Sequence, residues 1–263
     1  MDRAQVPVFV LCGGLGTRLQ EQTGLKPKAM VTVGDQPILM HVLRSYRKHG
    51  FKRFVLCTGF KSELIKEYFL NYPALNSDFT VDLETSDVVV HRVHHDLDLK
   101  VTVAYTGELT MTGARVARAA ERYLGDSEHF GVTYCDGLTD ANLGEEFDFH
   151  VSHGKIGTVL GVVAASRFGE FRMEGTLVTD FVEKPEFEDK WINGGYFFFR
   201  REFLDYLSTS EDCILERAPL VRLSRDRELH VHRNTGFWAC MDTLRDCNRL
   251  NELWDKDNAP WRV

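Results

Sequence analysis

Near the start of the chain, glycines and cations are spaced as a phosphate-binding loop requires, in the stretch FVLCGGLGTRLQEQTGLKPKAM (residues 9–30). Its candidate ligand-binding residues are Gly13, Gly14, Gly16, Thr17, Arg18 and Lys28. Glycines lack a Cβ atom, so their backbone N–H groups can approach a ligand closely and adopt positive φ angles. Arg18 can place a forked pair of donors on phosphate oxygens, and Lys28 adds a point charge beside the rigid Pro27. Together they predict a site for a triphosphate, although a glycine pair alone is more often only a tight turn.

Spacing excludes the two best-known phosphate-binding loops. The dinucleotide fingerprint G-x-G-x-x-G needs its third glycine where this chain has Leu19. The Walker A loop needs Gly-Lys followed by Ser or Thr after four intervening residues, and no lysine stands at that position. The loop is therefore of a third kind, G-G-x-G-T-R.

Two aspartates are candidates for holding a metal ion. Asp136 ends the apolar run FGVTYCD, and Asp242 follows the apolar run GFWACM. Carboxylates that follow strands gather at the ligand-binding edge of an open α/β sheet, and Mg²⁺ prefers such oxygen ligands. Alternatively, Asp136 is a turn residue and Asp242 is the N-cap of a following helix. Combined with the glycine loop, the two positions favour a Mg²⁺ site.

The loop, together with five further segments, resembles the sugar-1-phosphate nucleotidyltransferases. More narrowly, the chain is similar to the glucose-1-phosphate cytidylyltransferases. The resemblance rests on KPKAMVTVGDQPILMHVLRSYRKHGFKRFVLCTGFKSELIKEYF, MTGARVARAAERY, TYCDGLTD, WINGGYFFF and GFWACMDTLRD…LWDKDNAPW, which span almost the full length. It implies a Rossmann-like fold of the nucleotide-diphospho-sugar transferase type, and Mg²⁺ bound by Asp136 and Asp242. It departs from the family pattern at Cys12, where alanine is usual, and at Cys135, where glycine is frequent.

The resemblance also implies where the two substrates bind. The sugar 1-phosphate is expected at VEKP and NGGYFFF, whose candidate residues are Glu183, Lys184, Asn193 and Gly194. The nucleotide is expected beside the helix that TMTGARVAR opens, which makes Gly113 and Arg115 candidates. Alone, the EKP sequence would more often be a salt-bridged turn, and Arg115 could equally be an exposed helical arginine.

The elements that must position these residues alternate between strands and helices. Strands are expected at 6–12, 53–59, 100–107 and 129–136, and helices at 37–50, 61–70, 113–124 and 241–256. This alternation predicts an α/β fold, with a mostly parallel central sheet and helices on both faces. Residues 71–99 interrupt it as a small β excursion, with DVVVHRVHH as a possible hairpin. We expect one domain over 1–263 with a C-terminal elaboration, its nucleotide-binding half at about 1–140 and its sugar-phosphate-binding half at about 141–263.

Composition narrows the class of protein further. The 263 residues carry a net charge of −7, which argues against a nucleic-acid or membrane-surface binder. The six cysteines include no C-x-x-C pair, as expected of reduced thiols in a cytoplasmic protein. No apolar run is long enough to cross a membrane, and no secretory leader is evident. The histidines in HRVHH and HVHR lack the companion ligands of a zinc site.

The expected reaction is Mg²⁺-dependent transfer of CMP from CTP to a sugar 1-phosphate, most simply α-D-glucose 1-phosphate, with release of pyrophosphate. Arg18 and Lys28 are the expected catalytic residues, and a homo-oligomer is implied by the resemblance. Two alternatives stay open. One is an enzyme that uses UTP, dTTP or another sugar 1-phosphate, and the other is a catalytically silent sugar-nucleotide sensor.

Overall fold

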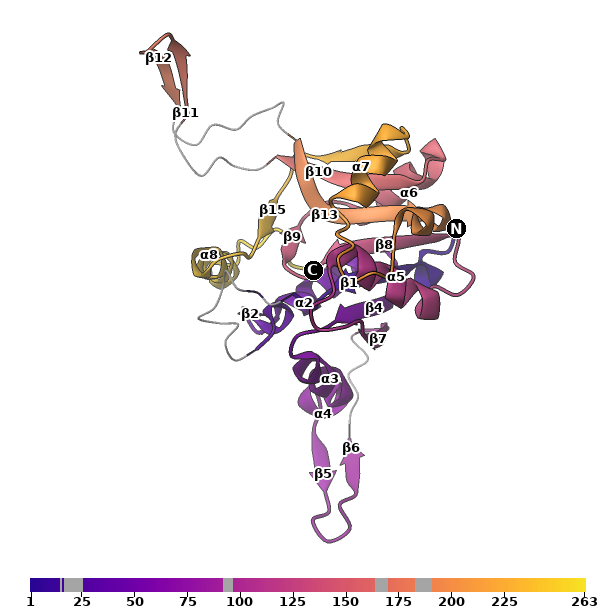
Figure 1. Cartoon of the computed structure of the whole chain (residues 1–263). Coiled ribbons are helices and arrows are strands. Elements are labelled where there is room, and N and C mark those ends of the chain that lie inside the picture. The colour runs from indigo at the N-terminus through magenta and orange to yellow at the C-terminus, as the bar shows by residue number, and fades with distance from the viewer. Residues whose placement is uncertain (15, 17–25, 92–96, 164–169, 183–190) are drawn as a thin grey trace.

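A seven-stranded sheet forms the centre of the protein. The computed structural model describes residues 1–14, 16, 26–91, 97–163, 170–182 and 191–263. The strands of this sheet are β1 (Pro7–Leu11), β4 (Arg53–Thr58), β7 (Lys100–Tyr105), β8 (His129–Tyr134), β10 (Gly157–Val163), β13 (Trp191–Arg200) and β14 (Leu229–Asn234). Their order across the sheet is β14-β10-β13-β8-β1-β4-β7 (Figure 1).

The sheet is mostly parallel, as the alternation of elements predicts. Strand β1 pairs in parallel with β4 and β8, β4 pairs in parallel with β7, and β10 pairs in parallel with β14. Only β13 runs against its neighbours β8 and β10. A parallel arrangement places the carboxyl ends of β1, β4, β7 and β8 at one edge, where ligands bind in open α/β sheets.

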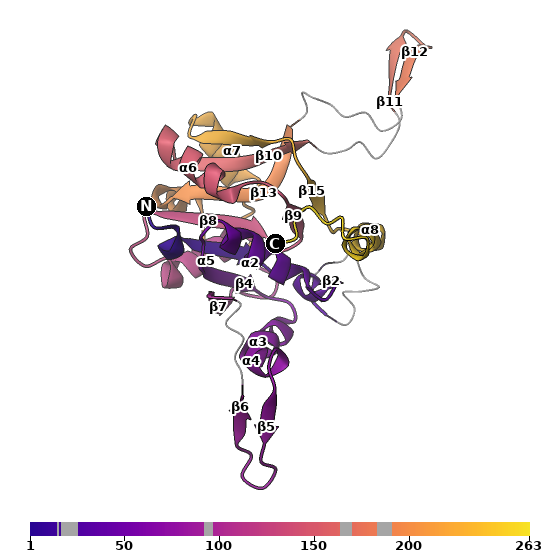
Figure 2. The ribbon, with the colours of Figure 1, turned by 180° about the vertical axis from the view of Figure 1, so that it is seen from behind.

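Helices cover both faces of this sheet (Figures 1 and 2). Each face buries a separate apolar core. One core includes residues of α2 (Ile38–Lys48), α3 (Ser62–Leu70), α6 (Leu143–His153) and α8 (Leu244–Asp255). The other includes residues of α5 (Thr112–Tyr123) and α7 (Ala218–Arg225). Because side chains alternate along a strand, Val8 and Val10 of β1 enter the first core while Phe9 and Leu11 enter the second.

Short elements surround this sheet. They are β2 (Thr32–Val33), β3 (Gln36–Pro37), β9 (Gly137–Thr139), β15 (Trp238–Cys240), α4 (Tyr72–Leu75), and the 3₁₀ turns η1 (Arg3–Gln5), η3 (Lys28–Met30) and η4 (Arg201–Tyr206). Two antiparallel pairs are β5 (Phe79–Val81) with β6 (Val88–Val90), and β11 (Glu170–Glu174) with β12 (Leu177–Val182). The β5–β6 pair projects from the body of the protein, which confirms the expected β excursion (Figure 1). The hairpin differs from the one expected in DVVVHRVHH, because Val88–Val90 pairs with the preceding Phe79–Val81, and residues 92–96 lie outside the described residues.

Helix α6 and strand β14 are two of the elements that were not expected from the sequence. The N-cap of α6 is Asn142, whose side chain accepts hydrogen bonds from the backbone of Gly144 and Glu145. Its C-cap is Gly154, which adopts a left-handed φ of 67°. Its apolar periodicity is interrupted because the polar residues Glu146 and His150 are buried in it.

The cysteines are reduced, as their spacing in the sequence predicts. All six cysteines are free thiols, and Cys12, Cys57, Cys135 and Cys247 are buried. Among the helices that the structure describes, none has the length and hydropathy needed to cross a bilayer.

Glu146 is a destabilising feature of the core. Its side chain is fully buried, and neither carboxyl oxygen has a hydrogen-bond partner among the described residues. Burial raises the pKa of Glu146 well above its usual value, because the apolar surroundings disfavour the charged form. The unfolded chain ionises this group near pH 4.3, so folding must take up a proton above that pH. Its contribution to stability therefore falls as the pH rises from there toward the pKa of the folded state.

We expect Glu146→Gln to raise the free energy of unfolding at pH 8 by about 1.4 kcal/mol or more, which is the value of one pKa unit. Glutamine keeps the shape of the side chain but cannot ionise. The gain over wild type should shrink as the pH falls toward 5, because the glutamate is then nearly neutral in both states. Urea denaturation at several pH values measures the difference in unfolding free energy between the variant and wild type, and Glu121→Gln on the exposed face of α5 is the control. A difference that does not change with pH would contradict the prediction.

Candidate functional site

A cavity of 310 Å³ opens at the carboxyl ends of the central strands. Its walls include predicted site residues from both halves of the chain: Gly13, Gly14, Gly16, Lys28, Arg115, Asp136 and Asp242. They meet because β1 and β8 are neighbouring parallel strands, with Leu11 opposite Tyr134. The segments that follow these two residues, the glycine loop and Asp136, must therefore emerge side by side.

Lys28 joins the two aspartates that the sequence singles out. Its Nζ atom lies 2.6 Å from Asp136 Oδ2 and 2.7 Å from Asp242 Oδ1. All three side chains are mostly buried, with 14%, 20% and 29% of their surface exposed. Burial by itself lowers the pKa of Lys28, but the two carboxylates outweigh it and raise this pKa above its usual value. The space between the carboxylates is thus one that accepts positive charge.

Backbone pairing brings Asp242 next to Asp136 across a sequence separation of more than a hundred residues. Strands β9 and β15 pair antiparallel, with Cys240 opposite Gly137. The backbone N–H of Met241 then donates to the Asp136 carbonyl at 2.9 Å. Backbone contacts alone therefore hold the residues directly before β9 and directly after β15 close together.

Asp246 is a supporting residue that the sequence analysis passed over. One of its carboxyl oxygens accepts hydrogen bonds from the backbone N–H groups of Asp242 and Thr243, at 3.2 and 2.9 Å. Thr243 is the N-cap of α8 and forms a capping box with Asp246, so Asp242 is not the cap. The sequence signal is Thr-x-x-Asp, the spacing of a capping box.

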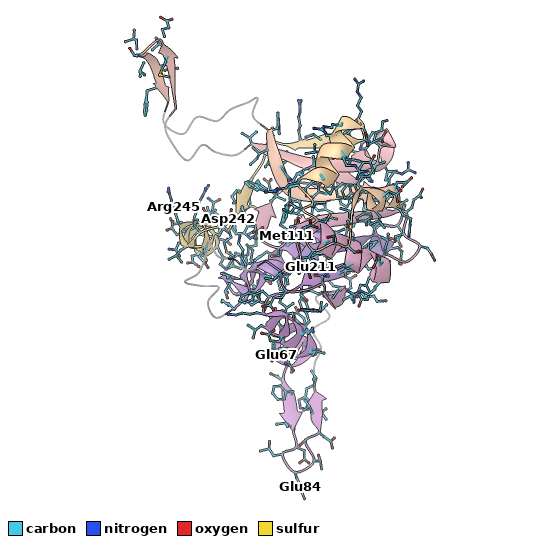
Figure 3. All side chains as sticks on the ribbon, viewed as in Figure 1. Glu67, Glu84, Met111, Glu211, Asp242 and Arg245 are labelled. Atoms are coloured by element: carbon cyan, nitrogen blue, oxygen red, sulfur yellow. The ribbon has the colours of Figure 1, made fainter. Side chains whose placement is uncertain are left out.

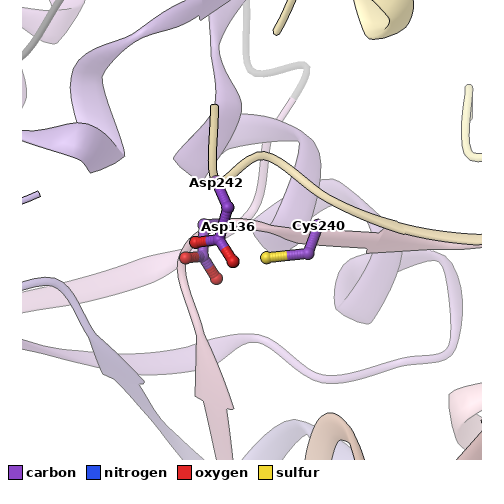
Figure 4. Close-up of side chains that lie close together, drawn as sticks. All are labelled: Asp136, Cys240 and Asp242. Atoms are coloured by element: carbon purple, nitrogen blue, oxygen red, sulfur yellow. The ribbon is translucent and has the colours of Figure 1, made fainter. Parts of the chain in front are cut away.

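A third potential metal ligand lies beside the two carboxylates. The Sγ atom of Cys240 and one carboxylate oxygen each of Asp136 and Asp242 all lie within 4.8 Å of one another. Figure 4 shows the sulfur directed toward the carboxyl groups. Burial, followed by the nearby Asp136 charge, raises the pKa of the Cys240 thiol. Among the described residues, this is the one group of at least three histidine, cysteine or acidic side chains close enough to share an ion.

Arg115 lines the cavity, but its terminal nitrogens are already engaged by the protein. Its side chain is 4% exposed, and Nη2 donates to the carbonyls of Gly13 and Glu108 at 2.9 and 3.1 Å. Nη1 donates to the carbonyls of Thr58 and Gly107 at 3.0 and 2.7 Å, and to Thr106 Oγ1 at 2.9 Å. The alternative that Arg115 is an exposed helical arginine is therefore wrong. It links the glycine loop to the ends of β4 and β7.

Two glycines of the predicted site are required by close packing. A Cβ atom at Gly13 would lie 2.2 Å from the Arg115 guanidinium carbon, so the glycine loop can cross this side chain only without one. At Gly113 it would lie 2.7 Å from Cys213 Sγ. Gly113 therefore packs α5 against the segment that precedes α7.

The predicted sugar-binding residues of β13 do not line this cavity, but Gly194 contacts strand β15, which leads to the metal-ligand candidates. Asn193 Oδ1 accepts a hydrogen bond from the Gly195 backbone at 2.8 Å, and the Gly194 carbonyl accepts one from Trp238 Nε1 at 2.8 Å. Trp238 belongs to β15, two residues before Cys240. The other predicted residues, Thr17, Arg18, Glu183 and Lys184, lie outside the described residues.

Comparisons with known proteins identify relatives that match most of the chain. The family model described as nucleotidyl transferase matches residues 8–239. A glucose-1-phosphate cytidylyltransferase from Salmonella typhi is 41% identical over 254 residues, which cover 97% of this chain and 98% of that protein. The catalytic subunit beta of a mannose-1-phosphate guanylyltransferase from Drosophila melanogaster is 27% identical over 259 residues, which cover 95% of this chain and 64% of that protein.

Solved structures share the same fold. HddC from Yersinia pseudotuberculosis, in complex with GMP-PN, superposes with a TM-score of 0.66 at 19% identity, covering 95% of this chain and 99% of that one. The Rossmann-like architecture expected from the sequence is therefore confirmed. With a family model matched over most of the chain and a relative 41% identical over almost its full length, the chain belongs to the nucleotidyl transferase family.

Proposed function

We propose that the protein transfers CMP from CTP to α-D-glucose 1-phosphate and releases pyrophosphate. The observation that carries this proposal is the pair Asp136 and Asp242, joined by Lys28 in the wall of a cavity that the glycine loop also lines. Such a site combines backbone donors, a cation and two carboxylates within reach of one polyphosphate. The choice of CTP and glucose 1-phosphate is supported by the 41% identical Salmonella protein.

The two carboxylates suit a Mg²⁺ ion. They are oxygen ligands, and the position of the Lys28 ammonium between them marks a space suited to a cation. When bound there by Asp136 and Asp242, Mg²⁺ would supply positive charge to phosphate oxygens.

The chain itself would orient two anions that repel each other. A phosphate oxygen of the sugar 1-phosphate is already anionic near neutral pH, so attack on the α-phosphorus of CTP needs no general base. Backbone N–H groups of Gly13, Gly14 and Gly16 would surround the triphosphate. Arg18 would hold its β and γ phosphates, and Lys28 would turn from the carboxylates toward the nucleotide phosphates. Positioning and charge neutralisation are the main contributions in such transfers.

The sugar 1-phosphate would bind on the β13 side of the cavity. Gly194 lies beside Gly137, the residue after Asp136, and beside Trp238, and Asn193 precedes it on β13. In this proposal Lys184 meets the sugar phosphate and Glu183 accepts from sugar hydroxyls. The nucleotide-binding half is then residues 1–140 and the sugar-binding half is 141–263. The six free thiols suit a reducing compartment, and we place the reaction in the cytoplasm.

We expect Asp242→Ala to lower Mg²⁺-dependent pyrophosphate release by about 100-fold or more. Loss of a residue that only supports a metal ligand typically costs 10–100-fold, so loss of a ligand should cost at least as much. Asp255→Ala, an exposed change on α8, is the control for the fold and the assay. Circular dichroism should show both variants folded. Undiminished release by Asp242→Ala would contradict the metal assignment.

A panel of CTP, UTP, dTTP and GTP, each combined with several sugar 1-phosphates, tests the substrates. We expect CTP with glucose 1-phosphate to give the highest kcat/KM. A better pair would replace the proposed substrates and keep the enzyme class, and the guanylyltransferase relatives show that the family uses more than one base. No release from any pair would favour a sugar-nucleotide sensor instead.

We infer that Arg115 acts on the nucleotide through the glycine loop that it holds. Arg115→Lys keeps the charge but loses the forked donors, so carbonyls of three segments lose partners. We expect a loss of about 2 kcal/mol or more in the free energy of unfolding, together with a raised KM for the triphosphate. Arg122→Lys, on the exposed side of the same helix, is the matched control. Unchanged stability with a raised KM would indicate a direct contact with the nucleotide.

We also propose that the protein is a homo-oligomer in which a second copy covers the β5–β6 arm. Phe79 pairs with Val90 and Val81 with Val88, so these four side chains share one face of the arm. Phe79, Val81 and Val88 are 50%, 42% and 56% exposed. A lone two-stranded hairpin is at best marginally stable in water, and covering its apolar face would stabilise it. Figure 3 shows Glu84 at the tip of the arm, far from Asp242.

Val81→Lys should lower the oligomeric state, because it places a charge in the apolar face of the arm. Thr80→Lys, on the opposite face, is the matched control and should leave the assembly intact. Light scattering coupled to size-exclusion chromatography measures the mass. A wild-type monomer, or an assembly that survives Val81→Lys, would contradict this role of the arm.

A further inference from the structure

Cys240 gives the proposed metal site a sulfur ligand in addition to its two carboxylates. Its Sγ atom lies within 4.8 Å of a carboxylate oxygen of Asp136 and of Asp242. We propose that these three side chains together bind a thiophilic divalent cation, of the class of Zn²⁺ or Co²⁺, in competition with Mg²⁺. The inference rests on the metal site of the proposed function and adds a ligand and an ion class to it.

The direction of the Cys240 side chain follows from the backbone. Cys240 is the last residue of β15, and Met241 continues the pairing with the β9 side by donating its N–H to the Asp136 carbonyl, so successive side chains here point to opposite sides. Met241 is 0% exposed and packs in the core. Cys240 and Asp242 therefore point together to the other side, toward Asp136. Figure 4 shows this convergence.

The donor set favours a softer ion than Mg²⁺. Mg²⁺ prefers oxygen ligands, whereas thiolates select Zn²⁺ and other thiophilic metals. One sulfur and two oxygens would fill three positions of a tetrahedral site and leave a fourth for water or a phosphate oxygen. On binding, a metal–sulfur bond forms and the thiol proton passes to solvent.

The space for such an ion already contains a positive charge. Lys28 Nζ contacts both carboxylates at hydrogen-bond distance, so a divalent ion must displace this ammonium. The exchange replaces one positive charge by two, opposite two carboxylates and a thiolate. Mg²⁺ forms only a weak bond to sulfur. A thiophilic ion also bonds the Cys240 sulfur, so it should displace the Lys28 ammonium more readily than Mg²⁺ does.

Titration of the full-length protein with Co²⁺ tests the inference, because a cobalt–thiolate bond has a charge-transfer absorption in the near ultraviolet. Wild type should develop this band, and Cys240→Ser should lose it and bind Co²⁺ at least tenfold more weakly. Cys247→Ser, a buried cysteine on α8, is the matched control and should keep both the band and the affinity. Asp242→Asn should weaken binding while the sulfur ligand remains.

The outcomes separate this inference from the proposed function. A wild-type protein without the band, or a band that survives Cys240→Ser, would overturn the sulfur ligand. Cys240→Ala serves as a second variant, and circular dichroism shows whether each variant is folded. Pyrophosphate release with Mg²⁺, measured on the same wild-type preparation, tests the function independently. A band without turnover would overturn the proposed function, whereas turnover without a band would overturn only the thiophilic site.

Discussion

Two carboxylates from distant parts of the chain are held close together beside one ammonium group, and the rest of the site depends on this constraint. Asp136 and Asp242 would repel each other across the space where Lys28 now lies at 2.6 and 2.7 Å. Partial burial strengthens both the repulsion between the carboxylates and their attraction to the Lys28 ammonium, because water screens the charges less. Such a cluster is stable only while a cation remains in it. Any ion that enters must therefore displace the Lys28 ammonium, which in the proposed mechanism turns toward a phosphate.

The scaffold holds this cluster with backbone contacts. The pairing of β9 with β15 fixes the main chain on either side, and the capping box of Thr243 and Asp246 fixes the start of α8. The Arg115 side chain holds the glycine loop in place, because it joins the Gly13 carbonyl to the ends of β4 and β7. Carboxylates held in this way need little reorganisation when a ligand binds, and preorganised charges of this kind are the basis of electrostatic catalysis.

Much of the fold could be predicted from the sequence, because its signals are local. Apolar runs such as that of β1 and the amphipathic pattern of α2 gave strands and helices close to their observed bounds. Helix α6 was missed because the buried polar residues Glu146 and His150 interrupt its apolar pattern. Strand β14 was missed because its alternating histidines resemble a surface segment, and only its pairing with β10 makes it a strand.

The sequence by itself determined the chemistry of the site: a glycine loop, cations, and aspartates that follow apolar runs. Residue types and spacing are local properties, so they also excluded the dinucleotide and Walker A loops. Only the tertiary structure decided which groups meet. It joined Lys28 to both carboxylates, directed Cys240 toward them, and engaged Arg115 with backbone carbonyls. These contacts link residues that are distant in sequence, and they depend on strand order and register, which no local pattern encodes.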